Sequence, residues 1–153
     1  MAYDGLVAGA MAIYLNGLLS GGRIEKIYQP DKEELILYIR TGRETRRLYI
    51  SSNSGHARMH LLDLDSEHSN PKIPPAFCML LRKHFQGGRI TKIRQIKSER
   101  IIEIYVDHAD ELGFTEEKKL IVEIMGKHSN IIAVDVATGR ISDSIKRISK
   151  DVN

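Results

Sequence analysis

One pattern occurs twice in this chain. Residues 21–29 begin Gly-Gly-Arg-Ile and recur, with the same start, at residues 87–95, which is 66 positions further on. An apolar run precedes each copy, at residues 10–20 and 76–86, and ends at the glycine pair. Each copy is therefore expected to form one helix followed by strands. Two such copies predict a pseudo-twofold domain in which two sheets bury one another.

The length and composition favour a single folded domain. A chain of 153 residues with 42% hydrophobic residues can bury a core, and it lacks the low-complexity segments that favour disorder. The one cysteine, Cys78, cannot form an internal disulfide. Its apolar neighbours predict a buried structural thiol, in keeping with a reducing compartment.

The first residues raise the question of a secretory signal. The segment 5–19 is apolar enough for one, but acidic Asp4 precedes it and no Lys or Arg does. No run approaches the roughly 18 apolar residues of a membrane span. We therefore expect an N-capped helix of a cytoplasmic protein that has no membrane partner.

The net charge of +3 is modest but unevenly distributed. Basic residues gather at 40–47 and 89–100, whereas residues 107–117 hold five acidic residues and no Lys or Arg. Basic strands beside an acidic loop are compatible with a phosphate backbone on one side of the surface. Solvated strand faces explain the same pattern, so charge alone leaves both interpretations open.

Capping residues and alternating patterns predict the elements. Asp4 caps a helix over residues 5–20, and Pro74-Pro75 begins a second helix that runs to about Phe85. The polar, proline-ended residues 65–73 form the joint between the halves. Period-two patterns predict eight strands, at residues 23–28, 35–40, 47–51, 58–62, 90–96, 101–106, 120–125 and 130–135.

These elements define an α+β fold class. We expect two packed four-stranded antiparallel sheets, a β-sandwich with flanking helices, built from repeat halves at about residues 4–64 and 70–135. Beyond the second half, the isoleucines at positions 141, 145 and 148 are spaced for a short helix.

The chain shows no recognised catalytic or metal-binding pattern. His56 and His60 lack a Cys, Asp or Glu partner set, so we expect no metal and no cofactor. No triad order, phosphate loop or dinucleotide fingerprint appears, so no catalytic residue is assigned and no enzyme is expected. Each glycine pair ends a helix rather than opening one, which explains it better than anion binding does.

The most unusual run is Gly-Lys-His-Ser-Asn at residues 126–130, between two predicted strands. A hairpin loop in which Gly126 and Asn130 take positive φ accounts for those two residues. A phosphate or partner contact would account for Lys127 and His128. Both interpretations stay open at this point.

Several motifs, in this order, resemble the N-terminal domain of the NFACT family. These proteins are bacterial ribosome quality-control factors, long described as fibronectin-binding proteins, and they have eukaryotic relatives. The motifs are Asp4-Gly5-Leu6, Gly21-Gly22-Arg23-Ile24 with Ile27-Tyr28-Gln29-Pro30, Asn70-Pro71 with residues 74–83, and residues 123–130. The resemblance covers essentially the whole chain, residues 1–153, and implies that further domains follow in a longer protein. It also implies the two-sheet fold of the N-terminal domain of formamidopyrimidine-DNA glycosylases.

The resemblance further implies a function in ribosome quality control. Family members bind large ribosomal subunits that are obstructed by peptidyl-tRNA, and bacterial members recruit alanyl-tRNA for template-free addition of C-terminal alanine tails. The ribosome performs the peptide-bond chemistry. The implied tRNA- or ribosome-binding residues are Asp4, Glu99, Arg100, Gly126, Lys127, His128, Ser129 and Asn130. The family pattern has Asp where this chain has Glu99, which puts tailing competence or tRNA choice in question.

Three alternatives accompany this hypothesis. A glycosylase of the same fold would use an N-terminal proline as its nucleophile, and Ala2 excludes that chemistry here. A fibronectin-binding adhesin would need surface display, although contact with fibronectin in vitro through basic strands is compatible with the sequence. A non-catalytic nucleic-acid-binding domain would bind tRNA only weakly by itself, because a few Lys and Arg confer weak, salt-dependent affinity.

Overall fold

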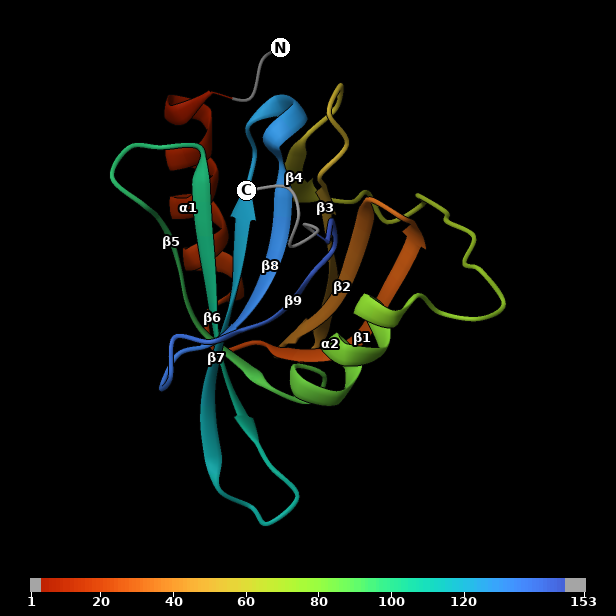
Figure 1. The fold of residues 1–153 in the computed structure, drawn as a ribbon, viewed down its shortest axis with the longest axis vertical. Coiled ribbons are helices and arrows are strands. Elements are labelled where there is room, and N and C mark those ends of the chain that lie inside the picture. Colours follow the sequence, from red (N-terminus) through yellow and green to blue (C-terminus); the bar gives the residue numbers. More distant parts are fainter. Residues whose placement is uncertain (1–3, 148–153) are drawn as a thin grey trace.

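The computed structural model describes residues 4–147 as one antiparallel sheet of nine strands with two α-helices and a short 3-10 helix (Figure 1). The strand order is β4-β3-β2-β1-β5-β6-β7-β8-β9, so the sheet continues from the first copy of the pattern into the second. The elements are α1 (Gly5–Leu19), β1 (Arg23–Asp31), β2 (Glu34–Thr41), β3 (Glu44–Ser51), β4 (Arg58–Leu61), α2 (Ala76–His84), β5 (Arg89–Gln95), β6 (Ile101–Ala109), β7 (Thr115–Glu123), η1 (Gly126–His128), β8 (Asn130–Asp135) and β9 (Ile141–Ser144).

Both helices form where the capping residues predict them. The carboxylate of Asp4 accepts a hydrogen bond from the N–H of Val7 at 2.9 Å and so caps α1. Gly21 follows the end of α1 with a φ of +85°, a conformation that favours glycine. Helix α2 begins directly after Pro75.

The two copies of the pattern meet where β1 and β5 begin, and there they exchange equivalent backbone hydrogen bonds. Each donor and acceptor has its counterpart 66 residues away, so a pseudo-twofold axis passes between Arg23 and Arg89, which face each other in the register. The bonds run from Gly21 N to Ile90 O (2.7 Å), from Gly87 N to Ile24 O (2.7 Å), from Ile90 N to Gly22 O (2.8 Å) and from Ile24 N to Gly88 O (2.9 Å). The glycine pairs therefore join the halves as well as ending the helices.

A single hydrophobic core lies between the two halves of the sheet and the helices. Leu37 and Leu48 of the first half belong to the same buried cluster as Ile104 and Leu120 of the second. The α+β class is confirmed. The expectation of two separate four-stranded sheets is wrong, because the backbone bonds at the glycine pairs continue one sheet through both halves. The likeness to the glycosylase domain stays an expectation.

The residues after β8 form a strand and not the expected short helix. Strand β9 pairs with β8, and the N–H of Ile145 then donates to the carbonyl of Ile131 at 2.9 Å. These bonds satisfy backbone groups that would otherwise lie unpaired at the edge of the sheet, which outweighs the helical spacing of the isoleucines. The third of them, Ile148, lies outside the described residues.

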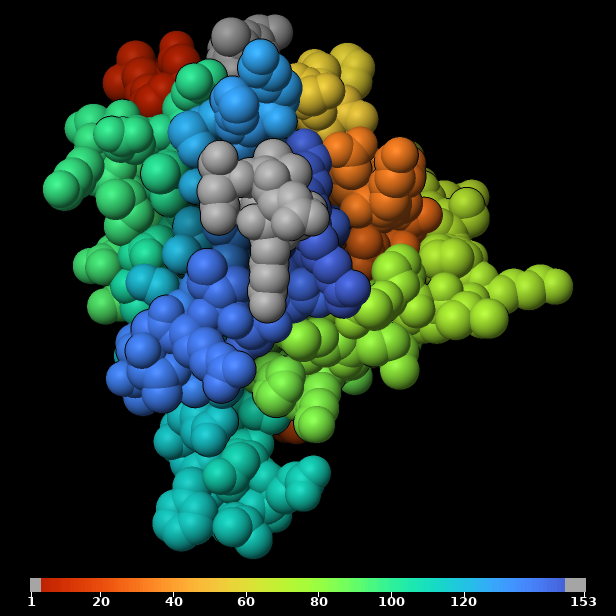
Figure 2. Space-filling view, viewed as in Figure 1, coloured from red at the N-terminus to blue at the C-terminus, as the bar shows by residue number. Residues whose placement is uncertain are grey.

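The acidic segment 107–117 is the outer part of a long β6–β7 hairpin and not a loop. Its turn is organised by the carboxylate of Asp110, which accepts hydrogen bonds from the N–H groups of Leu112 and Phe114, both at 2.9 Å. The hairpin projects from the body at the end opposite the start of α1 (Figure 1, Figure 2). The negative charge is thus carried away from the β5–β6 turn.

The junction between the halves has a testable packing requirement. A Cβ atom on Gly88 would lie 2.6 Å from Val106 Cγ1 and 2.9 Å from Phe85 O. We expect Gly88→Ala to lower the free energy of unfolding in urea by about 1–3 kcal/mol. Gly17→Ala is the matched control, because nothing lies within 4 Å of its Cβ position and alanine stabilises a helix by about 1 kcal/mol over glycine. Equal stability of the two variants would contradict the packing argument.

Candidate functional site

Three segments that are far apart in the sequence come together at one end of the molecule. They are the start of α1, the β5–β6 turn and the β7–β8 loop (Figure 1). The carbonyl of Ser98 in the turn lies so close to Gly5 that a side chain there would collide with it. The carbonyl of Arg100 accepts a hydrogen bond from the N–H of Ile124 at 2.8 Å, just before the β7–β8 loop. Asp4, the Glu99-Arg100 pair and residues 126–130 therefore belong to one surface, called here the loop end.

The β5–β6 turn has an unusual backbone. Lys97 and Ser98 both have positive φ, 45° and 60°, and the N–H of Glu99 donates to the carbonyl of Ile96 at 2.8 Å. This is the geometry of a tight hairpin turn that normally uses Asn or Gly. Two non-glycine residues in this conformation are a strain of the kind that gathers at functional sites. Glu99 and Arg100 follow the turn directly, and both are exposed.

Gln95 holds this turn against α1. Its Nε2 donates to the carbonyls of Gly5 at 2.6 Å and Glu99 at 2.7 Å. A Cβ atom on Gly9 would lie 2.6 Å from Gln95 Oε1, so a larger residue there would displace the Gln95 side chain. The amino-acid sequence alone did not predict this contact. The signal was present as Gly5 and Gly9, four residues apart within a predicted helix.

The β7–β8 loop combines exposed charge with a buried support. Gly126 opens the 3-10 helix η1 with a φ of +61°, and Lys127 and His128 on it are exposed. Ser129 keeps only 1% of its surface, and its Oγ accepts a hydrogen bond from the N–H of Met125 at 2.9 Å. The side chains of Lys127 and His128 therefore face solvent, while the buried Ser129 stabilises the turn.

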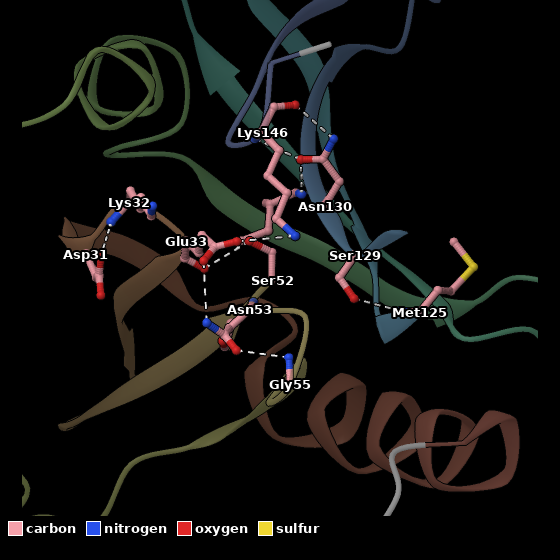
Figure 3. Close-up of polar contacts among 12 residues, drawn as sticks. Asp31, Lys32, Glu33, Ser52, Asn53, Gly55, Met125, Ser129, Asn130 and Lys146 are labelled. Atoms are coloured by element: carbon pink, nitrogen blue, oxygen red, sulfur yellow. Dashed lines mark hydrogen bonds and ion pairs between the residues drawn. The ribbon is translucent and has the colours of Figure 1, made fainter. Parts of the chain in front are cut away.

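Asn130 is a support residue inside β8. Its φ is not positive, so that part of the hairpin interpretation is wrong, whereas it is right for Gly126. The Asn130 Oδ1 accepts hydrogen bonds from the N–H groups of Ile131 (2.9 Å) and Lys146 (3.0 Å), and its Nδ2 donates to the carbonyl of Lys146 at 3.1 Å (Figure 3). Asn130 thus ties the end of the β7–β8 loop to the residues after β9.

The first half closes the other side of the loop end. Lys146 Nζ forms an ion pair with Glu33 Oε2 at 3.3 Å, and the Glu33 carbonyl accepts hydrogen bonds from both the N–H and the Oγ of Ser52 (Figure 3). The carbonyl of Ser54 lies 3.9 Å from the Cβ position of Gly126. The β3–β4 loop is therefore a neighbour of residues 126–130 in space.

The remaining candidate residues have structural surroundings. His60 packs on Tyr49 with ring centroids 5.2 Å apart. Cys78 is buried, and burial raises the pKa of its thiol, as expected for a structural cysteine. Within residues 4–147, no group of three or more His, Cys, Asp or Glu side chains is placed to hold a metal ion. Neither α-helix of that range has the length and apolar character needed to cross a membrane.

Comparisons with known proteins show which family the chain belongs to. Residues 4–153 match the model for the NFACT N-terminal and middle domains, and the chain belongs to that family. It is 41% identical to the Rqc2 homolog RqcH of Bacillus subtilis and 43% identical to that of Streptococcus suis, over 153 residues in each case. The archaeal homolog aRqcH of Methanocaldococcus jannaschii is 32% identical over 117 residues, or 74% of this chain. The chain covers 26% and 27% of the two bacterial relatives and 16% of the archaeal one.

Solved structures with other descriptions share the fold. The N-terminal domain of the fibronectin-binding protein PavA from Streptococcus pneumoniae matches 97% of this chain with a TM-score of 0.93 and 39% identity, over 55% of its own length. The fibrinogen-binding protein from Staphylococcus aureus matches 99% of the chain with a TM-score of 0.87 and 37% identity, over 53% of its length.

The role of Asn130 can be tested by stability. Asn130→Ala removes three hydrogen bonds at a residue that is 6% exposed, so we expect a loss of about 2–3 kcal/mol in the free energy of unfolding. Asn70→Ala is the control, since Asn70 is exposed and its Oδ1 has a single hydrogen-bond partner, Nδ1 of His68. Equal, small losses in chemical unfolding would show that Asn130 does not hold the loop.

The burial of Glu123, at the end of β7 beside the loop, predicts that the stability of the fold depends on pH. Burial raises the pKa of its carboxyl above the ordinary value, so the folded state holds the proton more tightly than the unfolded state. Its contribution to stability is therefore lost as pH rises from about 4.5 through the raised pKa. We expect Glu123→Gln to raise the melting temperature at pH 7, with the gain shrinking toward zero below about pH 4. Glu25→Gln, at an exposed strand position, is the control. If Glu123→Gln raised the melting temperature equally at pH 7 and below about pH 4, the raised pKa of Glu123 would be refuted.

Proposed function

We propose that this chain is the RNA-binding N-terminal module of a ribosome-associated quality-control factor. In this proposal the full-length protein works in the cytoplasm, where it binds obstructed large ribosomal subunits and alanyl-tRNA and supports template-free alanine tailing of stalled chains. The ribosome forms the peptide bonds. The chain positions RNA and needs no catalytic residue or cofactor for that task.

The observation that carries this proposal is the convergence at the loop end. Arg100 directly precedes β6, Lys127 and His128 lie in the β7–β8 loop, and each side chain is exposed. Backbone bonds and the side chains of Gln95 and Ser129 hold the turn and the loop. The three exposed side chains are therefore free to contact phosphates or bases. Family membership and relatives named RqcH support the same function.

Contact with fibronectin is the second candidate function. The descriptions of solved neighbours such as PavA favour it. The two candidates differ in the chemistry that they require. RNA binding needs the exposed cations of the loop end and weakens with salt, whereas the descriptions of those neighbours do not single out any surface of this fold.

The loop end can be tested in cells that express the full-length protein. Stalled large subunits are purified from wild type and from Arg100→Ala, and the co-purifying tRNA is sequenced. We expect the variant to co-purify with the same amount of large subunits but with at least about tenfold less of the specific tRNA. The reason is that one charge-assisted contact is worth about 1.5–3 kcal/mol. Arg43→Ala, an exposed arginine of the β2–β3 turn, is the matched control.

The outcomes separate the candidates. Unchanged tRNA recovery in Arg100→Ala would make the β5–β6 turn a plain hairpin tip and would count against its role in tRNA selection. Glu99→Asp in the same assay shows whether the longer side chain alters which tRNA is retained. Salt-insensitive binding of fibronectin by the purified chain, without tRNA binding, would favour the second candidate.

A further inference from the structure

The outer face of β5, β6 and β7 carries a cluster of cations around one buried aromatic ring. Lys92 Nζ lies 4.4 Å from the ring centroid of Tyr105, Arg94 Cζ lies 5.1 Å away and Lys119 Nζ lies 5.4 Å away. Tyr105 keeps only 6% of its surface, since these side chains cover it. This cluster, with Glu103 beneath it, is called here the Tyr105 platform.

The platform has more positive than negative charge. Glu103, 5% exposed, is its one carboxylate, and it pairs with Arg94 at 3.1 Å and Lys119 at 2.7 Å. None of the ion pairs among residues 4–147 includes Lys92. Within the cluster itself, three cations face one carboxylate. Asp107 and Glu117, the next cross-strand pair on this face, take part in none of the ion pairs among the described residues.

Glu103 and Lys119 are both charged near neutral pH. Burial by itself would raise the pKa of Glu103, but the hydrogen bonds from Lys119, Tyr105 and Arg94 outweigh it and lower the pKa. The hydrogen bond to Glu103 raises the pKa of Lys119. Glu103 therefore orders two of the cations without neutralising the third, and the Arg94 side chain still keeps 52% of its surface.

The first half of the repeat shows how the same arrangement behaves when the chain itself supplies partners. Lys26 and Arg47 flank Tyr38 in the strand register just as Lys92 and Lys119 flank Tyr105. There residues of the chain itself contact Tyr38 and Arg47, whereas Lys26 is exposed, as Lys92 is. His68 of the joint binds the hydroxyl of Tyr38 at 2.9 Å. Arg47 donates to three backbone carbonyls, one in the joint at Ser66 and two just before it at Asp63 and Leu64.

The comparison indicates what the second half is suited to bind. In the first half, oxygen acceptors from the chain itself satisfy Arg47. In the second half, Lys92 and Arg94 are exposed to solvent, so the corresponding acceptors would come from outside. Because the ring of Tyr105 is already covered, no base can stack on it, which leaves contacts to charged oxygens.

We propose that the Tyr105 platform binds successive phosphates of an RNA backbone without regard to base sequence. This inference rests on the proposed RNA-binding function and adds a second contact surface to the loop end. Strand β5 connects the two, since Lys92 and Arg94 lie on it and its far end leads into the Glu99-Arg100 turn. Phosphate contacts on the platform would position an RNA whose bases reach the turn.

The test measures binding of the purified chain to single-stranded RNA of about 20 nucleotides, in two unrelated sequences, between about 50 and 200 mM KCl. The variants are Lys92→Gln and its repeat counterpart Lys26→Gln. Protein concentrations reach about 100 µM, because non-specific dissociation constants fall near 10⁻⁴–10⁻⁶ M. Lys92→Arg tests rescue of the charge, and melting curves confirm that every variant is folded.

We expect Lys92→Gln to weaken binding of both RNAs by about 3- to 10-fold and to reduce the salt slope by about 0.7 to 1. Lys26→Gln should leave both quantities unchanged, and Lys92→Arg should restore them. Unchanged affinity in Lys92→Gln, with wild type binding RNA, overturns the platform and leaves the proposed function standing. An equal loss in Lys26→Gln also overturns it, as a general charge effect. A wild-type chain that binds no RNA overturns both proposals.

Discussion

The structure depends on four backbone hydrogen bonds between the starts of β1 and β5. They join the two copies of the repeat with the symmetry of the sequence itself, since each bond in one copy has its equivalent in the other. The glycine pairs make this possible because a Cβ atom on Gly22 or Gly88 would meet a neighbouring carbonyl and an apolar side chain within 3 Å. One short contact thus joins the strands of both copies into one sheet around a common core.

This junction also decides where the loops lie. β1 and β5 diverge from it, and the turns at their far ends reach the same side of the molecule (Figure 1). Glu33 of the β1–β2 turn can therefore pair with Lys146 from the other half, and the Ser54 carbonyl can approach Gly126. The loop end is a consequence of how the halves fold together, and the acidic β6–β7 hairpin lies at the opposite end for the same reason.

The sequence predicted local structure well and long-range pairing poorly. Asp4, Pro75 and the alternating isoleucines mark helices and strands because capping and burial act on nearby residues. The single sheet could not be predicted, since the bonds that create it use backbone groups that every residue has. For Asn130, turn preference suggested a positive φ, whereas its role is to bond Lys146, sixteen residues away. The sequence named Lys127 and Arg100 as candidates without showing that they are exposed, and Gln95 was missed because its partner Gly5 lies 90 residues away.

The repeat also allows structural and functional uses of one surface to be compared within one chain. Tyr38 and Tyr105 occupy matching register positions, each between a lysine of one neighbouring strand and a cation of the other. In the first half His68 of the joint contacts the tyrosine, and carbonyls of the joint and of the residues just before it satisfy Arg47. Lys26 is exposed, as Lys92 is, so the copies differ in the partners of the second cation, which are backbone carbonyls for Arg47 and Glu103 for Lys119. The second half leaves Lys92 and Arg94 open to solvent, which is the arrangement expected where an anionic partner takes the place of the joint.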